Sequence, residues 1–449
     1  MKNYLSKKII LLIFGLALIL FAIFSTKISF HDTHEYITVS KFFAGIQNID
    51  LFTSHSLLYP LITSVFLKIW PSFAMLKLAN VFWIFLMGVL LLYYFKNKSA
   101  FILFAFSPLT WFISIQSTPV LPASFFFLVS FYFFIRKKIK HNLPLSGIFL
   151  GLSISFYTPM IIIALIFCLI YFWNESFSDF FKYSIFLIIG LIPRFLTDYY
   201  LFKMPFYSFI RYAGSNLVVT LGLHPITRNI QTFVTPGVLL IFIVISPFLF
   251  KIYKINFKRF NKLILFLSLT SIVWFIRGAK IKYFLILSPI ILLLLSTVLT
   301  KKEIKWHCIL SIILTIFLTF NFFTIGENIL IEKELNIIKE EFNPDFIIGS
   351  PFESVKLAAH SWNSKHYFGW HNDLQSSIKN ESLIRGYNFE FESKIPLRDK
   401  LTFSAEFKRF SNREYNNFIL VTEKSEKEFP ELTSYNLKKC YEILCVYTF

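Results

Sequence analysis

Long apolar runs separated by short basic clusters constrain the fold of this chain more than any other feature. The clear candidates for membrane-spanning helices are residues 9–26, 73–95, 101–114, 119–136, 183–202, 233–252, 263–276, 281–300 and 306–325. A spanning helix needs about 20 apolar residues, or fewer where it is broken inside a bundle. The chain is 55% hydrophobic and 20% aromatic, more than a soluble domain of this length reaches. We therefore expect an all-α polytopic membrane protein.

Basic clusters predict which side of the membrane each connection faces. They lie before or between the apolar runs, at residues 2–8, 95–99, 136–141, 251–262 and 301–305. Cytoplasmic loops are enriched in Lys and Arg, so the net charge of +19 indicates inside loops and no nucleic-acid surface. We expect a cytoplasmic N-terminus and an extracytoplasmic C-terminus.

Two apolar stretches are assigned by the parity that these inside clusters require. The stretch 57–70 is short and carries Pro60 and Lys68, and counting it as a crossing would move the next basic clusters outside, so we expect an interfacial helix there. The stretch 145–173 is too long for one helix and contains Pro159, which favours two short crossings joined by a turn near residues 157–158. The total is about eleven crossings.

This topology divides the chain into a transmembrane domain, residues 1–325, with a first external loop at 27–72, and a C-terminal extracytoplasmic soluble domain, residues 326–449. The C-terminal segments DFIIGS, FILVTEK and YEILCVYTF are strand-like, and PFESVKLAAHSW is helix-like. This pattern predicts a small α/β domain. Within one strand, Cys440 and Cys445 would point to opposite faces and could join only across a turn, so we expect no bond between them.

The segment HDTHEYITVSKFF, residues 31–43, places Asp32 just outside the first apolar run. A carboxylate at this depth remains ionised beside lipid headgroups and is able to take a proton from a hydroxyl group. The alternative is that this polar segment only solvates a helix end. Its neighbours His31, His34 and Glu35 are candidate ligands of a divalent cation, although a complete site needs three or four ligands.

External cations form a second candidate element. They lie in loops predicted to face the same side as Asp32: Arg211, Arg228, Arg277, Lys280 and Lys282. Because external loops are normally poor in Lys and Arg, the group suggests an anionic partner such as a lipid phosphate or pyrophosphate. Headgroup snorkelling is the alternative.

Histidines and aromatic residues provide further candidates. His55, just before the stretch 57–70, either contacts a substrate or is an ordinary surface residue. In the C-terminal domain, HSWNSKHYFGWHND, residues 360–373, groups histidines, tryptophans and an aspartate. Such a group either holds a sugar or forms the core of the domain.

The layout and these motifs resemble the GT-C class of polytopic glycosyltransferases, which includes bacterial aminoarabinose transferases, protein O-mannosyltransferases and dolichol-phosphate-mannose-dependent mannosyltransferases. Members carry an acidic motif in the first external loop, with an Asp four residues before a Tyr, as Asp32 and Tyr36 stand here. Residues 37–52 and 55–72 resemble the amphipathic stretch and proline-containing helix that follow. Several members place a second acid in the segment matching 107–134, where this chain has Gln116.

The resemblance implies an inverting glycosyltransferase that moves a sugar from a polyprenyl phosphate to an acceptor hydroxyl of a lipid, glycan or protein at the outer membrane face. Asp32 is then the expected general base, and Glu35, Tyr36 and His55 are expected to contact substrate. The five external cations are expected to stabilise the departing lipid phosphate. Some members of the class also bind a divalent cation.

Two other functions are compatible with the same sequence. A lipid-linked glycan flippase or other transporter would be favoured by charged groups lining a cavity at the membrane midplane, and the apolar runs contain few of them. A non-catalytic membrane assembly subunit would be favoured if the external loops enclosed no cavity around Asp32.

Overall fold

The computed structural model describes residues 2–25, 31–46, 55–139, 141–173, 176–210, 212–213, 257–276, 281–319, 327–344, 346–349, 351–362, 367–370, 418–423 and 436–448. The chain forms two compact units. The bundle unit comprises Met1–Ser25, Lys77–Phe195 and Thr227–Asn321, and the tail unit comprises Thr26–Leu76, Leu196–Ile226 and Phe322–Phe449. The tail unit thus combines first-loop and C-terminal residues, and the domain boundary at residue 325 stays a prediction.

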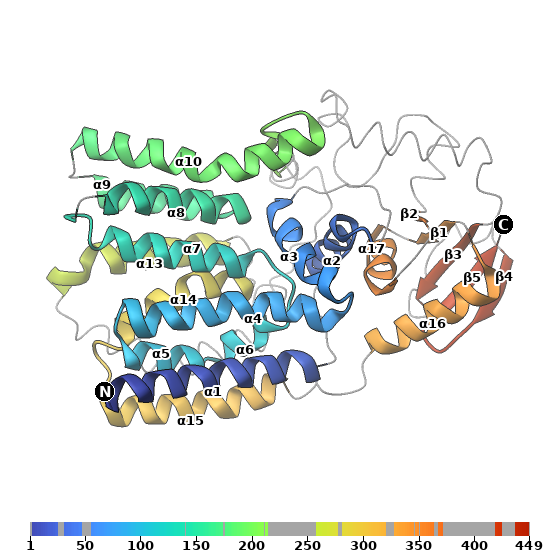
Figure 1. Cartoon of the computed structure of the whole chain (residues 1–449), viewed down its shortest axis with the longest axis horizontal. Helices are drawn as coiled ribbons and strands as arrows, with labels where there is room; N and C mark the ends of the chain where they lie inside the picture. Colours follow the sequence, from blue (N-terminus) through green and yellow to red (C-terminus); the bar gives the residue numbers. More distant parts are fainter. Residues whose placement is uncertain are drawn as a thin grey trace. The chain divides into compact units, whose positions relative to one another are not determined.

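The bundle unit is built of apolar helices that lie side by side (Figure 1). They are α1 (Lys2–Phe24), most of α4 (Phe73–Val89) with its π-helical end η1 (Leu90–Tyr94), α5 (Lys98–Ala105), α6 (Pro108–Ser114), α7 (Val120–Phe134), α8 (Asn142–Phe156), α9 (Met160–Phe172), the first part of α10 (Phe177–Phe202), α13 (Phe257–Ile276), α14 (Ile281–Leu295) and α15 (Lys301–Thr319). Among the described helices, Lys7–Phe24, Phe73–Tyr94 and Phe177–Phe202 are long and apolar enough to cross a membrane unaided. Shorter apolar helices suit a bundle in which neighbours satisfy the broken ends.

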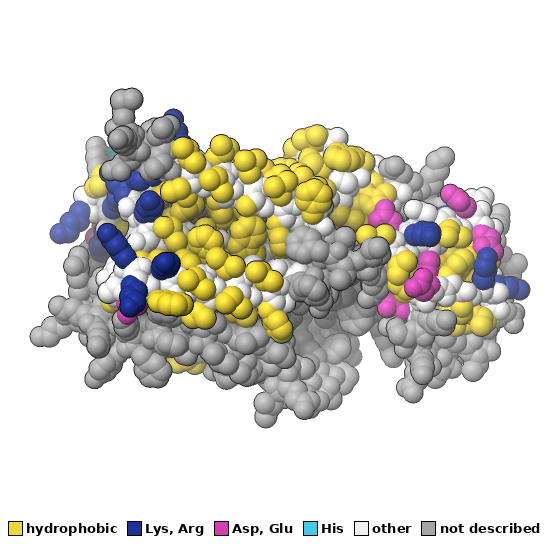
Figure 2. Space-filling view, turned by 90° about the horizontal axis from the view of Figure 1, so that it is seen from below, with side chains coloured by type: hydrophobic (Ala, Val, Ile, Leu, Met, Phe, Trp, Pro, Cys, Tyr) yellow, Lys and Arg dark blue, Asp and Glu magenta, His cyan; other side chains and the backbone are white. Residues whose placement is uncertain are grey.

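Exposed apolar side chains cover the flanks of this unit. Leu12 of α1, Ile188 of α10 and Phe317 of α15 are 61%, 56% and 70% exposed. Figure 2 shows hydrophobic surface along the helical part, with Lys and Arg side chains gathered at one end of it. An apolar flank with basic residues at the helix ends is the pattern of an integral membrane protein, and the predicted polytopic all-α fold is confirmed.

Prolines set two breaks in the bundle. α8 ends at Phe156, Tyr157 is extended, and α9 begins directly after Pro159, so the predicted break is confirmed. The prediction of one continuous helix over 101–114 is wrong, because α5 ends at Ala105 and α6 begins at Pro108. Proline has no N–H to give to a preceding turn and prefers the first turn of a helix, so the apolar run restarts there.

Helices α8 and α10 approach each other closely through glycines. A Cβ atom added at Gly151 would lie 2.1 Å from the carbonyl oxygen of Leu187, and one added at Gly190 would lie 2.1 Å from that of Ile148. Small residues that let two backbones approach are a common device of helix packing in membranes. Substitution of either glycine must therefore move the helices apart.

Arg194 on α10 extends this contact to the α8–α9 break. Its side chain is fully buried, and the guanidinium donates to Thr158 Oγ1 at 2.8 Å and to the carbonyl oxygen of Ile154 at 3.3 Å. The break frees backbone carbonyls at the end of α8. A cation from a neighbouring helix thus helps satisfy them.

The tail unit contains a mixed sheet with two helices, α16 (Glu327–Phe342) and α17 (Pro351–His360). The strands are β1 (Phe346–Gly349), β2 (Tyr367–Trp370), β3 (Phe418–Glu423), β4 (Asn436–Cys440) and β5 (Leu444–Thr448), in the order β2-β1-β3-β5-β4. β1 is parallel to β2 and β3, and β5 is antiparallel to β3 and β4. The predicted α/β domain is confirmed, whereas α16, β2 and β4 were not predicted.

One face of this sheet forms a core with the two helices. The buried cluster comprises Ile331, Leu335 and Ile338 of α16, Leu357 and Ala358 of α17, and Ile347, Ile419, Val421, Leu444 and Val446 of the sheet. Residues of one strand that are two apart point to the same face, as Ile419 and Val421 do. The α/β domain therefore has a core of its own, of which α17 is a part.

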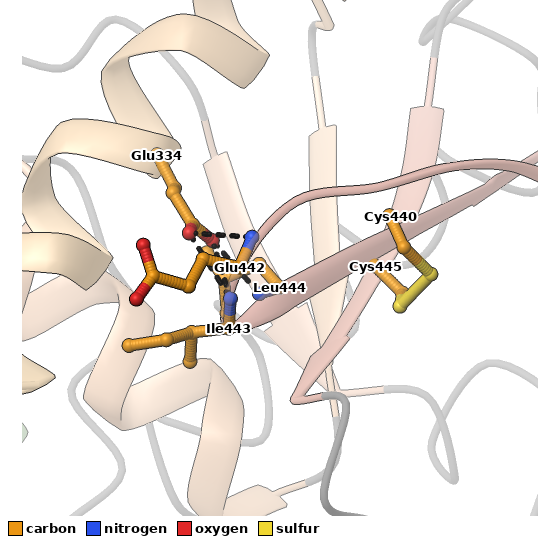
Figure 3. The surroundings of a disulfide bond; sticks show 6 residues. All are labelled: Glu334, Cys440, Glu442, Ile443, Leu444 and Cys445. Atoms are coloured by element: carbon orange, nitrogen blue, oxygen red, sulfur yellow. Dashed lines mark hydrogen bonds between the residues drawn. A yellow bond between two sulfur atoms is a disulfide. The ribbon is translucent and has the colours of Figure 1, made fainter.

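Cys440 and Cys445 form a disulfide, so the prediction of no bond between them is wrong (Figure 3). They are partners on the adjacent strands β4 and β5, with Cα atoms 4.1 Å apart. The intervening residues form a turn in which the N–H of Tyr441 donates to the carbonyl oxygen of Leu444 at 2.8 Å. The cysteines lie on two strands, and the argument from opposite faces of one strand does not apply.

Glu334 of α16 holds this turn in place (Figure 3). Its buried carboxylate accepts hydrogen bonds from the backbone N–H groups of Glu442 at 2.9 Å, Ile443 at 3.0 Å and Leu444 at 2.8 Å. Hydrogen bonds to an ionised acceptor are stronger than those between neutral groups. The turn is therefore joined to α16 as well as closed by its disulfide.

Helix α3 (Leu58–Ile69) confirms the predicted helix in the stretch 57–70. Leu58, Tyr59, Thr63 and Leu67 are among its buried residues, whereas Leu61, Val65 and Ile69, spaced four apart, are 38%, 58% and 75% exposed. An exposed apolar stripe suits a helix that lies on a membrane surface. That location stays a prediction.

Candidate functional site

Helix α2 (His31–Ala44) carries the acidic motif. Asp32 stands in its first turn, where a carboxylate is favoured by the helix dipole. Glu35 and Tyr36 follow three and four residues later, so the three positions share one side of the helix. The side chains of His31 and Asp32 lie outside the described part of the structure.

The fold brings three of the predicted site residues together. Glu35 Oε2 lies 3.7 Å from His55 Nε2, and the ring of Tyr36 lies 5.3 Å from the His55 ring. Tyr36, which is buried, also meets Tyr59 of α3 edge to face, with ring centroids 5.6 Å apart. A carboxylate, an imidazole and two phenols therefore gather one helical turn after Asp32. Tyr59 was not among the predicted site residues, although its place beside Pro60 at the start of α3 brings it near His55.

Most of the predicted external cations cannot be placed in this site. Arg211, Arg228, Arg277 and Lys280 lie outside the described residues, and Lys282 is described only as a backbone position in the first turn of α14. Their contact with a substrate stays a prediction.

The structure does describe the start of the loop that leads to Arg211. Tyr207 stacks on Phe202 at the end of α10, with ring centroids 3.8 Å apart, and both join Val39 of α2 and Leu57 in a buried cluster. This loop therefore begins against the helix that carries Asp32.

Asp198 of α10 stabilises the start of this loop at Ser208. Its Oδ2 accepts hydrogen bonds from the backbone N–H of Ser208 at 3.0 Å and from Ser208 Oγ at 2.6 Å, and both residues are buried. A carboxylate that accepts an N–H at the start of a helical turn satisfies a donor that has no partner within the turn. Asp198 is thus a local structural residue.

The candidate metal ligands do not come together in the described part of the chain. His34 is 8% exposed, and its ring lies 5.4 Å from the ring of His360, on a different side of α2 from Glu35. Among the described residues, no group of three or more His, Cys, Asp and Glu side chains is arranged to hold a metal ion. Metal binding by His31, His34 and Glu35 stays a prediction.

Two members of the C-terminal aromatic group pack within the tail unit, His360 fully buried and Trp362 partly buried. The rings of His360 and Trp362 lie 5.5 Å and 4.9 Å from the ring of Phe73, and His360 Nδ1 donates to the carbonyl oxygen of Lys356 at 2.8 Å. Burial lowers the pKa of His360 to about 3, so the imidazole is neutral. Of the alternatives for this group, core packing describes these two residues; His366 and His371 lie outside the described part.

The structure combines a bundle of apolar helices, an acidic helix in the first loop and a C-terminal α/β domain, which is the layout expected of a GT-C-like fold. Two crystal structures of ArnT from Cupriavidus metallidurans share the fold. The apo structure superposes with a TM-score of 0.62 at 8% sequence identity, and the structure bound to undecaprenyl phosphate superposes with a TM-score of 0.64 at 9% identity. Each match covers 99% of this chain and 98% of the ArnT chain. No protein-family model and no curated protein match the sequence.

Proposed function

We propose that this protein is an inverting glycosyltransferase that moves a sugar from a polyprenyl phosphate to an acceptor hydroxyl at the outer membrane face. The observation that carries the proposal is the match to ArnT over 99% of the chain. The match includes the first loop and the C-terminal domain as well as the bundle. One of the two ArnT structures holds undecaprenyl phosphate, a polyprenyl phosphate of the kind that would carry the sugar in the proposed donor and leave in the reaction.

In the proposed reaction, the Asp32 carboxylate takes the proton of the acceptor hydroxyl. The acceptor oxygen attacks the anomeric carbon, and the bond between that carbon and the lipid phosphate oxygen breaks with its electrons on the phosphate. This single displacement inverts the anomeric configuration. Arg211, Arg228, Arg277, Lys280 and Lys282 are the proposed partners of the departing phosphate.

Glu35, Tyr36 and His55 are proposed to position the sugar or the acceptor. They gather one turn from Asp32, with the Glu35 and His55 side chains 23% and 25% exposed. Partly exposed carboxylate and imidazole groups are able to accept hydrogen bonds from sugar hydroxyls. The buried ring of Tyr36 contacts the His55 ring on one side and the buried ring of Tyr59 on another.

Two observations support an extracytoplasmic C-terminal domain and a cytoplasmic N-terminus. The Cys440–Cys445 disulfide suits an oxidising compartment, because cytosolic thiols are kept reduced. Exposed basic residues lie at helix ends of the bundle unit, namely Lys8, Lys96, Lys98, Arg136, Lys138, Lys301 and Lys302, as expected for inside loops.

Sugar transfer in membranes tests the proposal. Membranes that contain the wild-type protein are incubated with a panel of radiolabelled polyprenyl-phosphate sugars, and transfer to endogenous acceptors is compared with that by Asp32→Asn. The matched control is Asp179→Asn, which removes a carboxylate from the first turn of α10 and is expected to leave transfer unchanged. At matched expression, Asp32→Asn should lower transfer at least about 100-fold.

The outcomes separate the enzyme from its proposed base. Transfer that persists in Asp32→Asn contradicts the role of Asp32 but leaves a glycosyltransferase. Absence of transfer from every donor in all three proteins contradicts the enzyme and favours the lipid-linked glycan flippase.

A further inference from the structure

Two sides of helix α2 contact different parts of the tail unit. Asp32, Glu35, Tyr36 and Val39 each lie three or four residues from another member of the set, as do His34, Ile37 and Lys41. Each set therefore forms one stripe of the helix. The first stripe meets His55, Tyr59 and Leu57. The second meets helix α17 of the α/β domain, through His360, Ala359 and the residues that follow.

Lys41 is the polar centre of the second stripe. Its side chain is fully buried, and its ammonium donates to the carbonyl oxygens of Ala358 at 3.4 Å, of Ala359, and of Ser361 at 3.0 Å. The last carbonyls of an α-helix have no partner within the helix. Lys41 therefore closes the C-terminal end of α17, where a cation also meets the negative end of the helix dipole.

Aromatic contacts and neighbouring charges add to this cap. The Lys41 ammonium lies 3.7 Å from the ring centroid of Trp362, within the range of a cation–π interaction. Burial lowers the pKa of Lys41 well below its ordinary value, while the Glu332 carboxylate of α16 raises it. The ammonium of Lys339, also on α16, donates to Ser361 Oγ. The groups around Ser361 thus join α2, α16 and α17.

A buried polar group is costly unless its hydrogen bonds are satisfied. Loss of the Lys41 side chain would therefore destabilise both helices that it joins. On one side is α17, whose Leu357 and Ala358 belong to the core of the α/β domain. On the other is the helix that carries Asp32, nine residues before Lys41. No apolar side chain at position 41 could satisfy the three carbonyls.

We propose that Lys41 is a positioning residue that fixes the acidic helix α2 on the end of α17, so that the C-terminal domain determines the orientation of Asp32 and Glu35. This inference rests on the proposed function in its catalytic part. It assigns the α/β domain a direct part in transfer, as the support of the acidic helix. The link between Lys41 and α17 itself does not depend on the reaction.

The test compares Lys41→Met with Lys333→Met, which removes an exposed lysine from α16. Backbone hydrogen exchange in detergent is followed in residues 31–44 and 351–360, and kcat and donor KM are measured on the same preparations. Lys41→Met should exchange faster in both segments and should lower kcat about 10-fold or more, because small displacements of catalytic groups are costly. Donor KM should change less than about 3-fold, since α2 would be misoriented rather than lost.

A milder variant keeps the proposal testable if Lys41→Met fails to fold. Trp362→Leu removes the ring beside the ammonium but leaves the three carbonyls and the cation, and it should move exchange and kcat in the same direction by less. Lys333→Met should match the wild type in both measurements.

Each result is decisive for one part of the inference. Unchanged exchange in α2 and α17 of Lys41→Met overturns the structural link. Faster exchange with unchanged kcat overturns the positioning role. If the wild type transfers no sugar, the proposed function fails, and the exchange measurement alone supports or overturns the link between Lys41 and α17.

Discussion

Glu35 Oε2 lies 3.7 Å from His55 Nε2, and this contact joins helix α2 to the residues just before α3. If both side chains hold the same substrate group, their effects on transfer are not independent. We expect Glu35→Gln and His55→Gln each to lower transfer about 10-fold, and the double variant to lose little more than the worse single variant. A double-mutant cycle on kcat/KM measures this coupling. Losses that multiply in the double variant would show that the two residues act separately.

Because His360 is buried in its neutral form, we expect the stability of the folded protein to fall at acidic pH. Burial holds its pKa at about 3, below the 6.5 of an unperturbed histidine, so the unfolded chain binds the proton more readily. The resulting stability is fully present above pH 6.5 and is lost as the pH falls toward 3, by about 2–3 kcal/mol at pH 4.5. Melting in detergent at pH 7.5 and 4.5 measures this loss.

His360→Asn is the matched variant, because its amide nitrogen is able to replace Nδ1 as donor to Lys356. It should melt with a smaller difference between the two pH values than the wild type. An equal difference in both proteins would assign the acid sensitivity to other groups.

Loss of the Glu334 carboxylate should destabilise the C-terminal domain. Glu334→Ala leaves the N–H groups of residues 442–444 without their buried acceptor and should destabilise the domain by about 2–3 kcal/mol. Hydrogen exchange of these amides should rise. Glu340→Ala, at an exposed position of the same helix, is the control, and an equal effect of both substitutions would contradict the role of Glu334.

The Cys440–Cys445 disulfide allows a direct test of topology. In intact cells, a membrane-impermeant maleimide should label the tail only after an impermeant reductant has opened the bond. A variant with both cysteines changed to Ser should give no such labelling and should lose about 2 kcal/mol of stability, as expected for a short closed loop. Labelling of intact cells without reductant would contradict the disulfide, and labelling only after cell lysis would place the domain in the cytoplasm.

Glycine packing between α8 and α10 predicts a severe effect of a single methyl group. Gly151→Ala places Cβ 2.1 Å from a backbone oxygen, whereas Gly88→Ala places it 3.1 Å from the Phe14 ring, which has room to adjust. We expect Gly151→Ala to lower the melting temperature clearly, at a cost of about 1–3 kcal/mol, and Gly88→Ala to have the smaller effect. Size-exclusion profiles after heating measure both, and equal profiles would contradict the close contact.

Features that depend on residues near one another in the sequence were predictable from it. Apolar runs and Pro159 predicted the described bundle helices other than α5 and α6, together with the α8–α9 break, because each depends on neighbouring residues. Once helix α2 is known, the spacing of Asp32, Glu35 and Tyr36 places them on one side of it. The break at Pro108 was missed because the apolar run continues through it.

Contacts between distant segments were not predictable in the same way. The disulfide depended on a turn at residues 441–444, whose apolar letters are strand-like. In the sequence, Lys41 looks like an ordinary polar residue of an amphipathic helix. Its partners lie more than 300 residues later in the chain. Only the position of a lysine on the stripe of Ile37 hinted at a buried role.

The contact of Arg194 with the α8–α9 break also bears on the order in which the protein is made. A guanidinium facing lipid is costly to insert, and a nascent helix that carries one needs acceptors at hand when it leaves the translocon. Ile154 and Thr158 are synthesised about 40 residues earlier. The hydrogen-bond acceptors of Arg194 are therefore translated before the arginine itself. A chain with the order of these helices reversed would have to insert the arginine before its acceptors were made.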